Sequence, residues 1–228
     1  MNLLENIRGV TFDAFGTLLA VNPSVGHLYA EVLAEHGGHA TPEEVEARFR
    51  QAFAEVTNAS EGRILDRAAW TAIVQKTFAG LHPEESLPVL FRALWDTFGQ
   101  ARCFSVLPGV IEVLEALKAH GLPLAVISNN DARQYAVFDQ IGLRKYFDHL
   151  LLSAEVGVAK PDPGIFRQAE RLLGFGPEHL LHIGDSPSED IAGAQAAGWR
   201  CLQVGEREPA PGVPHVKDMT ELAACLAS

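Results

Sequence analysis

The sequence predicts an α/β fold in which a parallel sheet is covered by helices and a second, helical domain is inserted after the first strand. Short apolar runs of buried-strand length alternate with helical patterns near the start of the chain and again from about residue 122 onward. Residues 22–99 contain amphipathic helical patterns and no run that resembles a strand. We therefore predict a sheet domain of residues 1–20 and 100–228 and an inserted domain of residues 21–99.

Five apolar runs are the candidate strands of the sheet domain. They lie at residues 10–12, 124–127, 150–152, 180–183 and 201–204. Three of the helical segments between them stop at a glycine, the residue that most readily closes a helix, at Gly121, Gly142 and Gly174. Asp162 and Pro163 begin the last of these with a capping residue and a proline in the first turn. Repeats of strand, helix and strand indicate a parallel sheet with helices on both faces.

The inserted segment carries four helical stripes of apolar residues, which is typical of a small bundle. Ser24 can cap the first helix, and Thr41-Pro-Glu-Glu44 is a capping box ahead of the second. Trp70 lies on the third stripe and Phe91 on the fourth, which ends at Gly99. We expect the four helices to form one compact domain.

Composition and charge argue against several classes of function. The chain has 228 residues, a formal net charge of −11 and no run of Lys and Arg, so a nucleic-acid partner is not expected. Its cysteines, Cys103, Cys201 and Cys225, are too scattered for a disulfide framework or a zinc site. The N-terminus does not resemble a signal peptide, and no apolar run reaches the roughly 18 residues of a membrane span. We predict a cytoplasmic protein without a membrane partner.

Chemically capable side chains follow the first four strand candidates. Asp13 follows the first strand, Ser128 and Asn129 follow the second, Lys160 lies a few residues beyond the third, and Gly184-Asp-Ser-Pro-Ser-Glu-Asp190 follows the fourth. Ligands bind open parallel sheets at the carboxyl ends of their strands. We therefore expect these four segments to converge on one crevice.

In this order, the four segments resemble the signature segments of the haloacid dehalogenase superfamily. The resemblance covers nearly the whole chain, because the inserted helices look like the cap domain of that superfamily. It implies a Rossmann-like catalytic core and a cap that closes over the crevice and sets the choice of substrate. It also implies hydrolysis through a covalent intermediate on Asp13.

The chemistry of the residues gives each position a predicted role. A tight turn at Gly16 would expose the Asp13 carboxylate for attack on an electrophile, and Thr17 would orient that carboxylate by a hydrogen bond. Ser128, with Asn129 beside it, can bind a phosphoryl oxygen through its hydroxyl and through backbone N–H. Lys160 would neutralise the nucleophile and the anionic oxygen of the substrate.

Oxygen ligands in the first and fourth segments predict a magnesium site. Asp13, Asp185 and the backbone carbonyl of Phe15 would hold the ion, because Mg²⁺ prefers oxygen ligands and two close carboxylates repel each other without a cation. We assign Asp190 a supporting role, in which it holds Lys160 or a metal-bound water. Arg63, in the inserted domain, is the candidate residue for substrate specificity. His182, inside the fourth strand, is interpreted as a packed core residue.

Phe15 is a departure from the phosphatases that the chain resembles, which usually have a second aspartate at this position. That aspartate protonates the leaving group and later activates water, and general acid catalysis is typically worth about 10²–10⁴ in rate. The first interpretation is a Mg²⁺-dependent phosphatase that acts through an aspartyl-phosphate on a small phosphorylated metabolite.

Two alternatives stay open. An aromatic residue at this position is a feature of the superfamily's haloacid dehalogenases, in which halide leaves without a proton. Those enzymes need no metal and have small polar residues where this chain has Asp185. They also bind the substrate with an arginine early in the cap, and neither Arg48 nor Arg50 clearly matches it. The second alternative is a catalytically impaired protein that binds a phosphorylated ligand or a partner.

Overall fold

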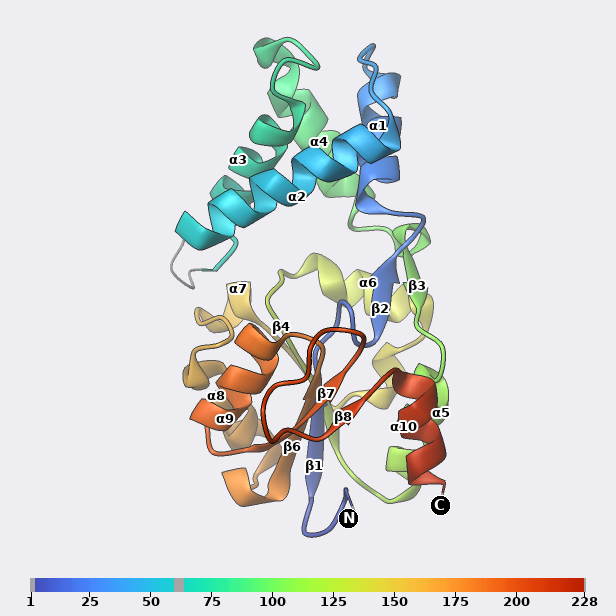
Figure 1. Cartoon of the computed structure of the whole chain (residues 1–228), viewed down its shortest axis with the longest axis vertical. Helices are drawn as coiled ribbons and strands as arrows, with labels where there is room; N and C mark the ends of the chain where they lie inside the picture. Colours follow the sequence, from blue (N-terminus) through green and yellow to red (C-terminus); the bar gives the residue numbers. More distant parts are fainter. Residues whose placement is uncertain (1–2, 60–63, 228) are drawn as a thin grey trace. The chain divides into compact units, whose positions relative to one another are not determined.

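The computed structural model describes residues 3–59 and 64–227 and contains two compact units. One unit consists of residues 1–20 and 106–228, and the other of residues 21–105 (Figure 1). The sequence placed the second boundary at residue 99. In the structure the inserted unit extends to residue 105, because β3 (Phe104–Val106) pairs with β2 (Leu19–Val21) where the chain leaves and rejoins the first unit.

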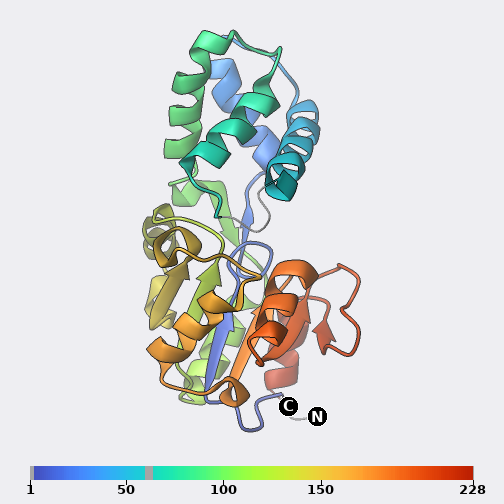
Figure 2. The ribbon, with the colours of Figure 1, turned by 90° about the vertical axis from the view of Figure 1, so that its left-hand side faces the viewer.

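The first unit is built on a six-stranded sheet in which every neighbouring pair is parallel, so the predicted α/β fold is confirmed. The strand order is β5-β4-β1-β6-β7-β8. The strands are β1 (Gly9–Phe12), β4 (Leu124–Ser128), β5 (His149–Leu152), β6 (Leu180–Gly184), β7 (Arg200–Val204) and β8 (His215–Val216). Figure 2 shows β1, in blue, between the green β4 and the orange β6. The carboxyl ends of β1, β4 and β6 are therefore adjacent.

Helices cover both faces of this sheet (Figure 1). On one face α8 (Pro163–Leu173) and α9 (Ala192–Ala196) pack on the strands through Ile165, Phe166 and Ala194, which are almost fully buried. On the other face α5 (Val110–Ala119) packs against α10 (Met219–Leu226). The remaining helical segments are α6 (Arg133–Ile141), α7 (Ser153–Val156), η3 (Arg144–Tyr146), η4 (Pro177–His179) and η5 (Pro187–Ile191). Each fully buried Leu, Ile or Phe side chain stabilises the fold by about 1.5–3 kcal/mol, so both helical layers stabilise the sheet.

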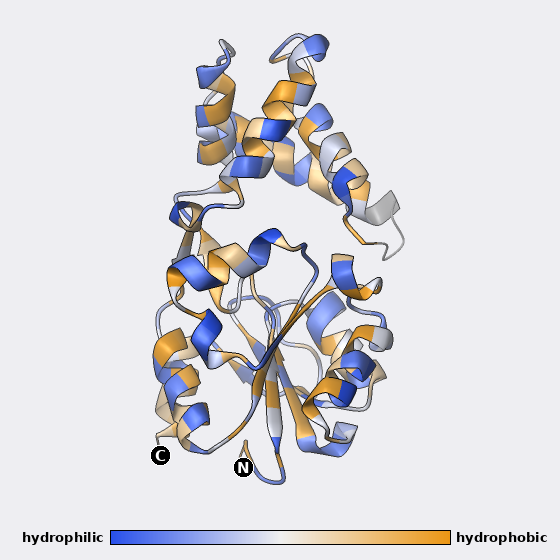
Figure 3. Ribbon diagram, turned by 180° about the vertical axis from the view of Figure 1, so that it is seen from behind, coloured by the Kyte–Doolittle hydropathy of each residue, from blue (hydrophilic) through white to orange (hydrophobic). Residues whose placement is uncertain are grey.

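The described part of the inserted unit is mainly helical, as the amphipathic patterns predicted. They are α1 (Val25–Glu35), α2 (Pro42–Ala59), α3 (Arg67–Phe78) and α4 (Leu87–Thr97), with the short turns η1 (Glu84–Ser86) and η2 (Ala101–Cys103). The predicted caps are confirmed, because Ser24 accepts the His27 N–H and Thr41 accepts the Glu44 N–H. Leu33, Phe78 and Leu90 are fully buried at the centre of the bundle. Each helix has hydrophobic and hydrophilic residues along its length (Figure 3).

The helices of the described residues include none that is both long enough and apolar enough to cross a membrane.

Candidate active site

A tight turn after β1 brings the first and fourth segments together. Asp13 donates its backbone N–H to the Ile183 carbonyl of the neighbouring strand, and Gly16 donates its own to the Leu19 carbonyl at 2.8 Å. Gly16 has a φ of +91°, a backbone conformation that residues other than glycine rarely adopt. A Cβ added to Gly16 would lie 2.7 Å from the carboxyl carbon of Asp185. Glycine is therefore required at this position by both the backbone and the neighbouring carboxylate.

Three carboxylates and one ammonium meet at this point. Asp13, Asp185 and Asp190 each offer an oxygen, and the three oxygens lie within 4.8 Å of one another. The Lys160 Nζ donates hydrogen bonds of 2.6 Å to both Asp13 Oδ1 and Asp190 Oδ1. Lys160 is 2% exposed and Asp190 1%. Lys160 thus supplies one positive charge to a buried cluster that carries up to three negative charges.

Of the two carboxylates bonded to Lys160, Asp13 has the negative charge that is less well compensated. Burial raises the pKa of Asp13 to about 7, although the Lys160 ammonium beside it has the opposite effect. Burial would also raise the pKa of Asp190, but Lys160 and the hydrogen bond from His182 together outweigh it and hold that pKa well below its usual range. Burial disfavours the charged form of Lys160, but Asp13 and Asp190 keep its pKa above the ordinary value. A further cation would relieve the remaining repulsion, and an oxygen-only donor set fits Mg²⁺.

The loop after β6 positions Asp190. The Ser186 side chain accepts the Glu189 N–H, and the Asp190 Oδ2 accepts the Ser186 N–H at 2.9 Å. Residues Pro187–Ile191 form a π-helical turn, a distortion that is common at functional sites. A Cβ on Gly184 would overlap the Asp190 side chain at 2.3–2.4 Å, so glycine lets the carboxylate lie against the end of β6.

Asn129 fixes the backbone of Lys160. Its Oδ1 accepts the Lys160 N–H at 2.8 Å, and its Nδ2 donates to the Lys160 carbonyl at 2.9 Å. The sequence placed Asn129 with Ser128 at a phosphoryl oxygen, but the side-chain amide is committed to Lys160. A substrate contact of Asn129 would therefore come from its backbone N–H. The side chain instead joins the end of β4 to the segment that carries the ammonium.

The predicted hydrogen bond from Thr17 to the nucleophile is absent, so that expectation was wrong. The Thr17 Oγ1 is buried and has no hydrogen-bond partner among the described residues. The Asp13 Oδ1 is instead engaged by Lys160, whose two-fold link to Asp13 and Asp190 holds that carboxylate. A buried hydroxyl without a partner costs about 1–3 kcal/mol, and the described residues do not offset this cost at Thr17.

The other predicted residues differ in their placement. Ser128 ends β4 and is buried, and its hydroxyl donates to Gln134 Oε1 at 3.4 Å. Phe15 is half-buried in the turn beside Gly16. Arg63 lies outside the described residues. Arg207, which the sequence did not single out, has its Nη2 3.4 Å from Asp185 Oδ2 with a side chain 60% exposed. Its position in an irregular loop left no periodicity that could have indicated it.

His182 is a buried core residue, as predicted, but it also supports the cluster. Thr11 and His182 are neighbours on β1 and β6, and the Thr11 Oγ1 lies 2.8 Å from His182 Nδ1. The other ring nitrogen, Nε2, lies 3.3 Å from Asp190 Oδ1. Burial lowers the pKa of His182, so the ring is neutral and can donate from Nε2 while Nδ1 accepts from Thr11. Two polar residues in otherwise apolar strands were the sequence signal for this link.

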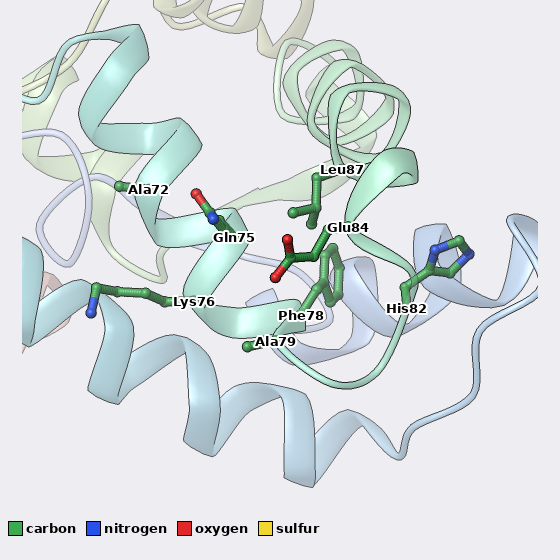
Figure 4. Close-up of a pocket in the computed structure, with 8 residues that line it drawn as sticks. All are labelled: Ala72, Gln75, Lys76, Phe78, Ala79, His82, Glu84 and Leu87. Atoms are coloured by element: carbon green, nitrogen blue, oxygen red, sulfur yellow. The ribbon is translucent and has the colours of Figure 1, made fainter.

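The inserted unit has a separate surface hollow of about 340 Å³ (Figure 4). It is lined by Ala72, Gln75, Lys76, Phe78, Ala79, His82, Glu84 and Leu87. The Lys76 ammonium is held by Glu55 at 2.7 Å. None of the strand-end residues lines this hollow, so the candidate active site is the carboxylate cluster.

Comparison with known families identifies the arrangement of these segments. The model of the haloacid dehalogenase-like hydrolases matches residues 7–198, which is most of the chain. The chain belongs to this family. The haloacid dehalogenase-like fold accounts for the parallel sheet, and the matched range includes all four strand-end segments.

Curated and solved relatives agree with this assignment. The human haloacid dehalogenase-like hydrolase domain-containing protein 3 is 34% identical over 206 residues, which are 87% of this chain and 82% of the relative. A 2-haloacid dehalogenase from Pseudomonas syringae is 28% identical with a TM-score of 0.68, over 97% of this chain and 98% of the other. A haloacid dehalogenase-like phosphatase from Thermococcus onnurineus has the same TM-score at 23% identity, over 96% and 98%. Hydrolases of both kinds therefore share the fold.

Proposed function

We propose that this haloacid dehalogenase-like hydrolase is a Mg²⁺-dependent phosphatase that forms an aspartyl-phosphate at Asp13. The observation that carries the proposal is the cluster of Asp13, Asp185 and Asp190, whose oxygens lie within 4.8 Å of one another beside Lys160. Hydrolases of this family commonly use Mg²⁺. A reaction that needs no metal would gain nothing from Asp185, because this carboxylate does not contact Lys160 and adds repulsion beside Asp13.

Each residue of the site has a different role in the proposed reaction. Asp13 attacks the phosphorus atom and forms a new P–O bond while the bond to the leaving oxygen breaks. Lys160 offsets negative charge on the nucleophile and on the phosphoryl group, and Ser128 binds a phosphoryl oxygen. Water then cleaves the aspartyl-phosphate, which releases inorganic phosphate and restores the Asp13 carboxylate.

Asp13, Asp185 and the carbonyl of Phe15 would hold the Mg²⁺, and Asp190 would keep Lys160 in place. When bound, the ion supplies positive charge to the phosphoryl oxygens. With three carboxylates, Lys160 and Mg²⁺ the charges balance, and Arg207 beside Asp185 offsets the nearby carboxylate of Glu189. A site with balanced charge admits an anionic substrate despite the net charge of −11 on the whole chain.

A small phosphorylated metabolite is the proposed substrate, and the cytoplasm the proposed compartment. The buried thiols of Cys103 and Cys201 are not in disulfide bonds, which is consistent with a reducing environment.

The runner-up function is hydrolytic dehalogenation of a 2-haloacid through an ester at Asp13. Phe15 favours it, because halide needs no proton from a general acid. The two arginines considered for substrate binding are engaged elsewhere: Arg48 pairs with Glu44 at 3.0 Å and Arg50 with Glu46 at 3.1 Å. These exposed pairs are weak, so it is the retained Asp185 that supports the phosphatase.

A side-by-side substrate screen distinguishes these functions. We expect hydrolysis of activated aryl phosphates and acyl phosphates with Mg²⁺, little activity after EDTA, and no halide release from 2-haloacids. Phosphate release is measured colorimetrically and halide with an ion-selective electrode. Halide release that is unaffected by chelator would replace the phosphatase with the dehalogenase. Binding of a phosphate analogue without hydrolysis of any ester would favour the impaired binding protein.

Phe15→Asp should raise kcat/KM for phosphate esters with poor leaving groups, by up to about 10²-fold. The new carboxyl group would protonate the leaving oxygen, a step that Phe15 cannot perform, whereas activated aryl esters should gain little. The measurement is the dependence of kcat/KM on leaving-group pKa across a series of esters. Phe15→Asn is the matched control, because asparagine is polar and nearly the size of aspartate but cannot act as an acid. An equal slope in Phe15→Asp and wild type would contradict this account of Phe15.

A further inference from the structure

Gln134 is a buried polar residue next to the proposed phosphoryl site. It lies in the first turn of α6 and is 2% exposed, as is Ser128. Its Oε1 accepts the Ser128 hydroxyl at 3.4 Å, while its Nε2 has no hydrogen-bond partner among the described residues. An unpaired buried donor lowers stability, so this amide needs an explanation beyond packing.

The helical pattern makes the choice of glutamine more informative. Gln134 occupies the same stripe as Val137, Phe138 and Ile141, at the spacing of an apolar helix face. A leucine or methionine of similar size would bury there without an unpaired amide. The amide is therefore a feature that the fold does not require and that a bound ligand would explain.

The direction of the hydrogen bond decides what Ser128 can do. In the structure the Ser128 hydroxyl gives its hydrogen to Gln134 Oε1, so that hydrogen is not available to an anionic oxygen. A half-turn of the Gln134 amide exchanges its oxygen and its nitrogen. The Nε2 would then donate to Ser128 Oγ, and the hydroxyl would be free to donate its hydrogen to a substrate.

We propose that Gln134 is a positioning residue that redirects the Ser128 hydroxyl. Without substrate the hydroxyl donates its hydrogen to Gln134 Oε1, and with substrate it donates to an oxygen of the tetrahedral phosphoryl group. This inference rests on the proposed function, in which Ser128 binds a phosphoryl oxygen. Turning the amide gives Nε2 a partner in Ser128 Oγ, moves Oε1 to the place that Nε2 held, and aligns two hydrogen bonds in series, which strengthen each other in a buried setting. No covalent bond changes, because both hydrogens move only by rotation.

Two substitutions of Gln134 by side chains of nearly its own size separate the role of its Nε2 donor from that of its Oε1 acceptor. Gln134→Glu keeps an acceptor for the Ser128 hydroxyl and removes the donor, so Ser128 stays directed inward. Gln134→Met removes both. In the full chain with Mg²⁺, we expect Gln134→Glu to weaken calorimetric binding of inorganic phosphate by about tenfold to hundredfold and to raise KM similarly. Gln134→Met should have a smaller effect, and kcat should change less than KM in both.

Gln140→Glu controls for the added charge, because Gln140 is exposed on the same helix, and it should bind phosphate like wild type. In a Ser128→Ala background, Gln134→Met should weaken phosphate binding no further. Unchanged phosphate binding in both Gln134 variants, where Ser128→Ala alone weakens it, would overturn this inference and leave the proposed function intact. Failure of the wild-type chain to bind phosphate would overturn both. A lower melting temperature with unchanged phosphate binding would reduce Gln134 to a packing role and overturn the inference.

Discussion

Asp13→Asn is expected to lower kcat for an activated aryl phosphate by on the order of 10³-fold or more. The amide cannot act as the nucleophile, so the covalent path through this residue is closed. Asparagine has nearly the volume of aspartate, and Asp190 still holds the Lys160 ammonium at 2.6 Å. Steady-state kinetics with saturating Mg²⁺ measure the loss, and a thermal melt reports on the fold.

The stability of this variant is part of the same expectation. Burial already disfavours the charged carboxylate of Asp13, as its raised pKa shows, so a neutral side chain should leave the melting temperature unchanged or higher. Asp139→Asn is the matched control, because Asp139 is exposed on α6. It should retain wild-type turnover. Wild-type turnover in Asp13→Asn itself would exclude a covalent intermediate at this position.

Lys160→Met is expected to remove activity and also to lower the free energy of unfolding by about 3–5 kcal/mol. The substitution leaves Asp13 and Asp190 buried without their shared ammonium, and two uncompensated carboxylates repel each other. Urea unfolding measures the change. The exposed pair Lys118–Asp148, with side chains 37% and 45% accessible, provides the control. Lys118→Met should change stability by less than about 1 kcal/mol.

A double variant separates the charge effect from lost packing. Adding Asp190→Asn to Lys160→Met removes one of the two stranded charges, so part of the stability should return while activity stays absent. If Lys160→Met alone is as stable as wild type, the ion pairs of 2.6 Å do not contribute to the fold as argued here.

Much of the fold could be predicted because its signals are local. Five strands and the main helices followed from apolar periodicity and from caps such as Ser24, which the structure contains. The missed strands, β2, β3 and β8, have only two or three residues each, too few for a pattern to appear. Their pairing depends on where the chain is brought by the rest of the fold.

The candidate site could be predicted in its residues and in the contacts of Lys160 with Asp13 and Asp190, but not in its other hydrogen bonds. The order of the four segments and their positions after predicted strands led to Asp13, Lys160 and Asp185. Hydrogen bonds between distant segments, such as those of Asn129 with the Lys160 backbone, depend on side-chain geometry that the sequence does not encode locally. The same holds for Thr17, which was expected to bond a carboxylate and has no partner among the residues described.

The pairing of β2 with β3 has a consequence for engineering. The Asn22 N–H donates to the Cys103 carbonyl at 2.8 Å, so the two chain ends of the inserted helices lie side by side. A graft between such closely spaced ends needs no long linker and places little strain on the host sheet. Chimaeras that exchange residues 22–103 for the corresponding segment of a relative are therefore a practical test of whether the inserted unit sets the choice of substrate.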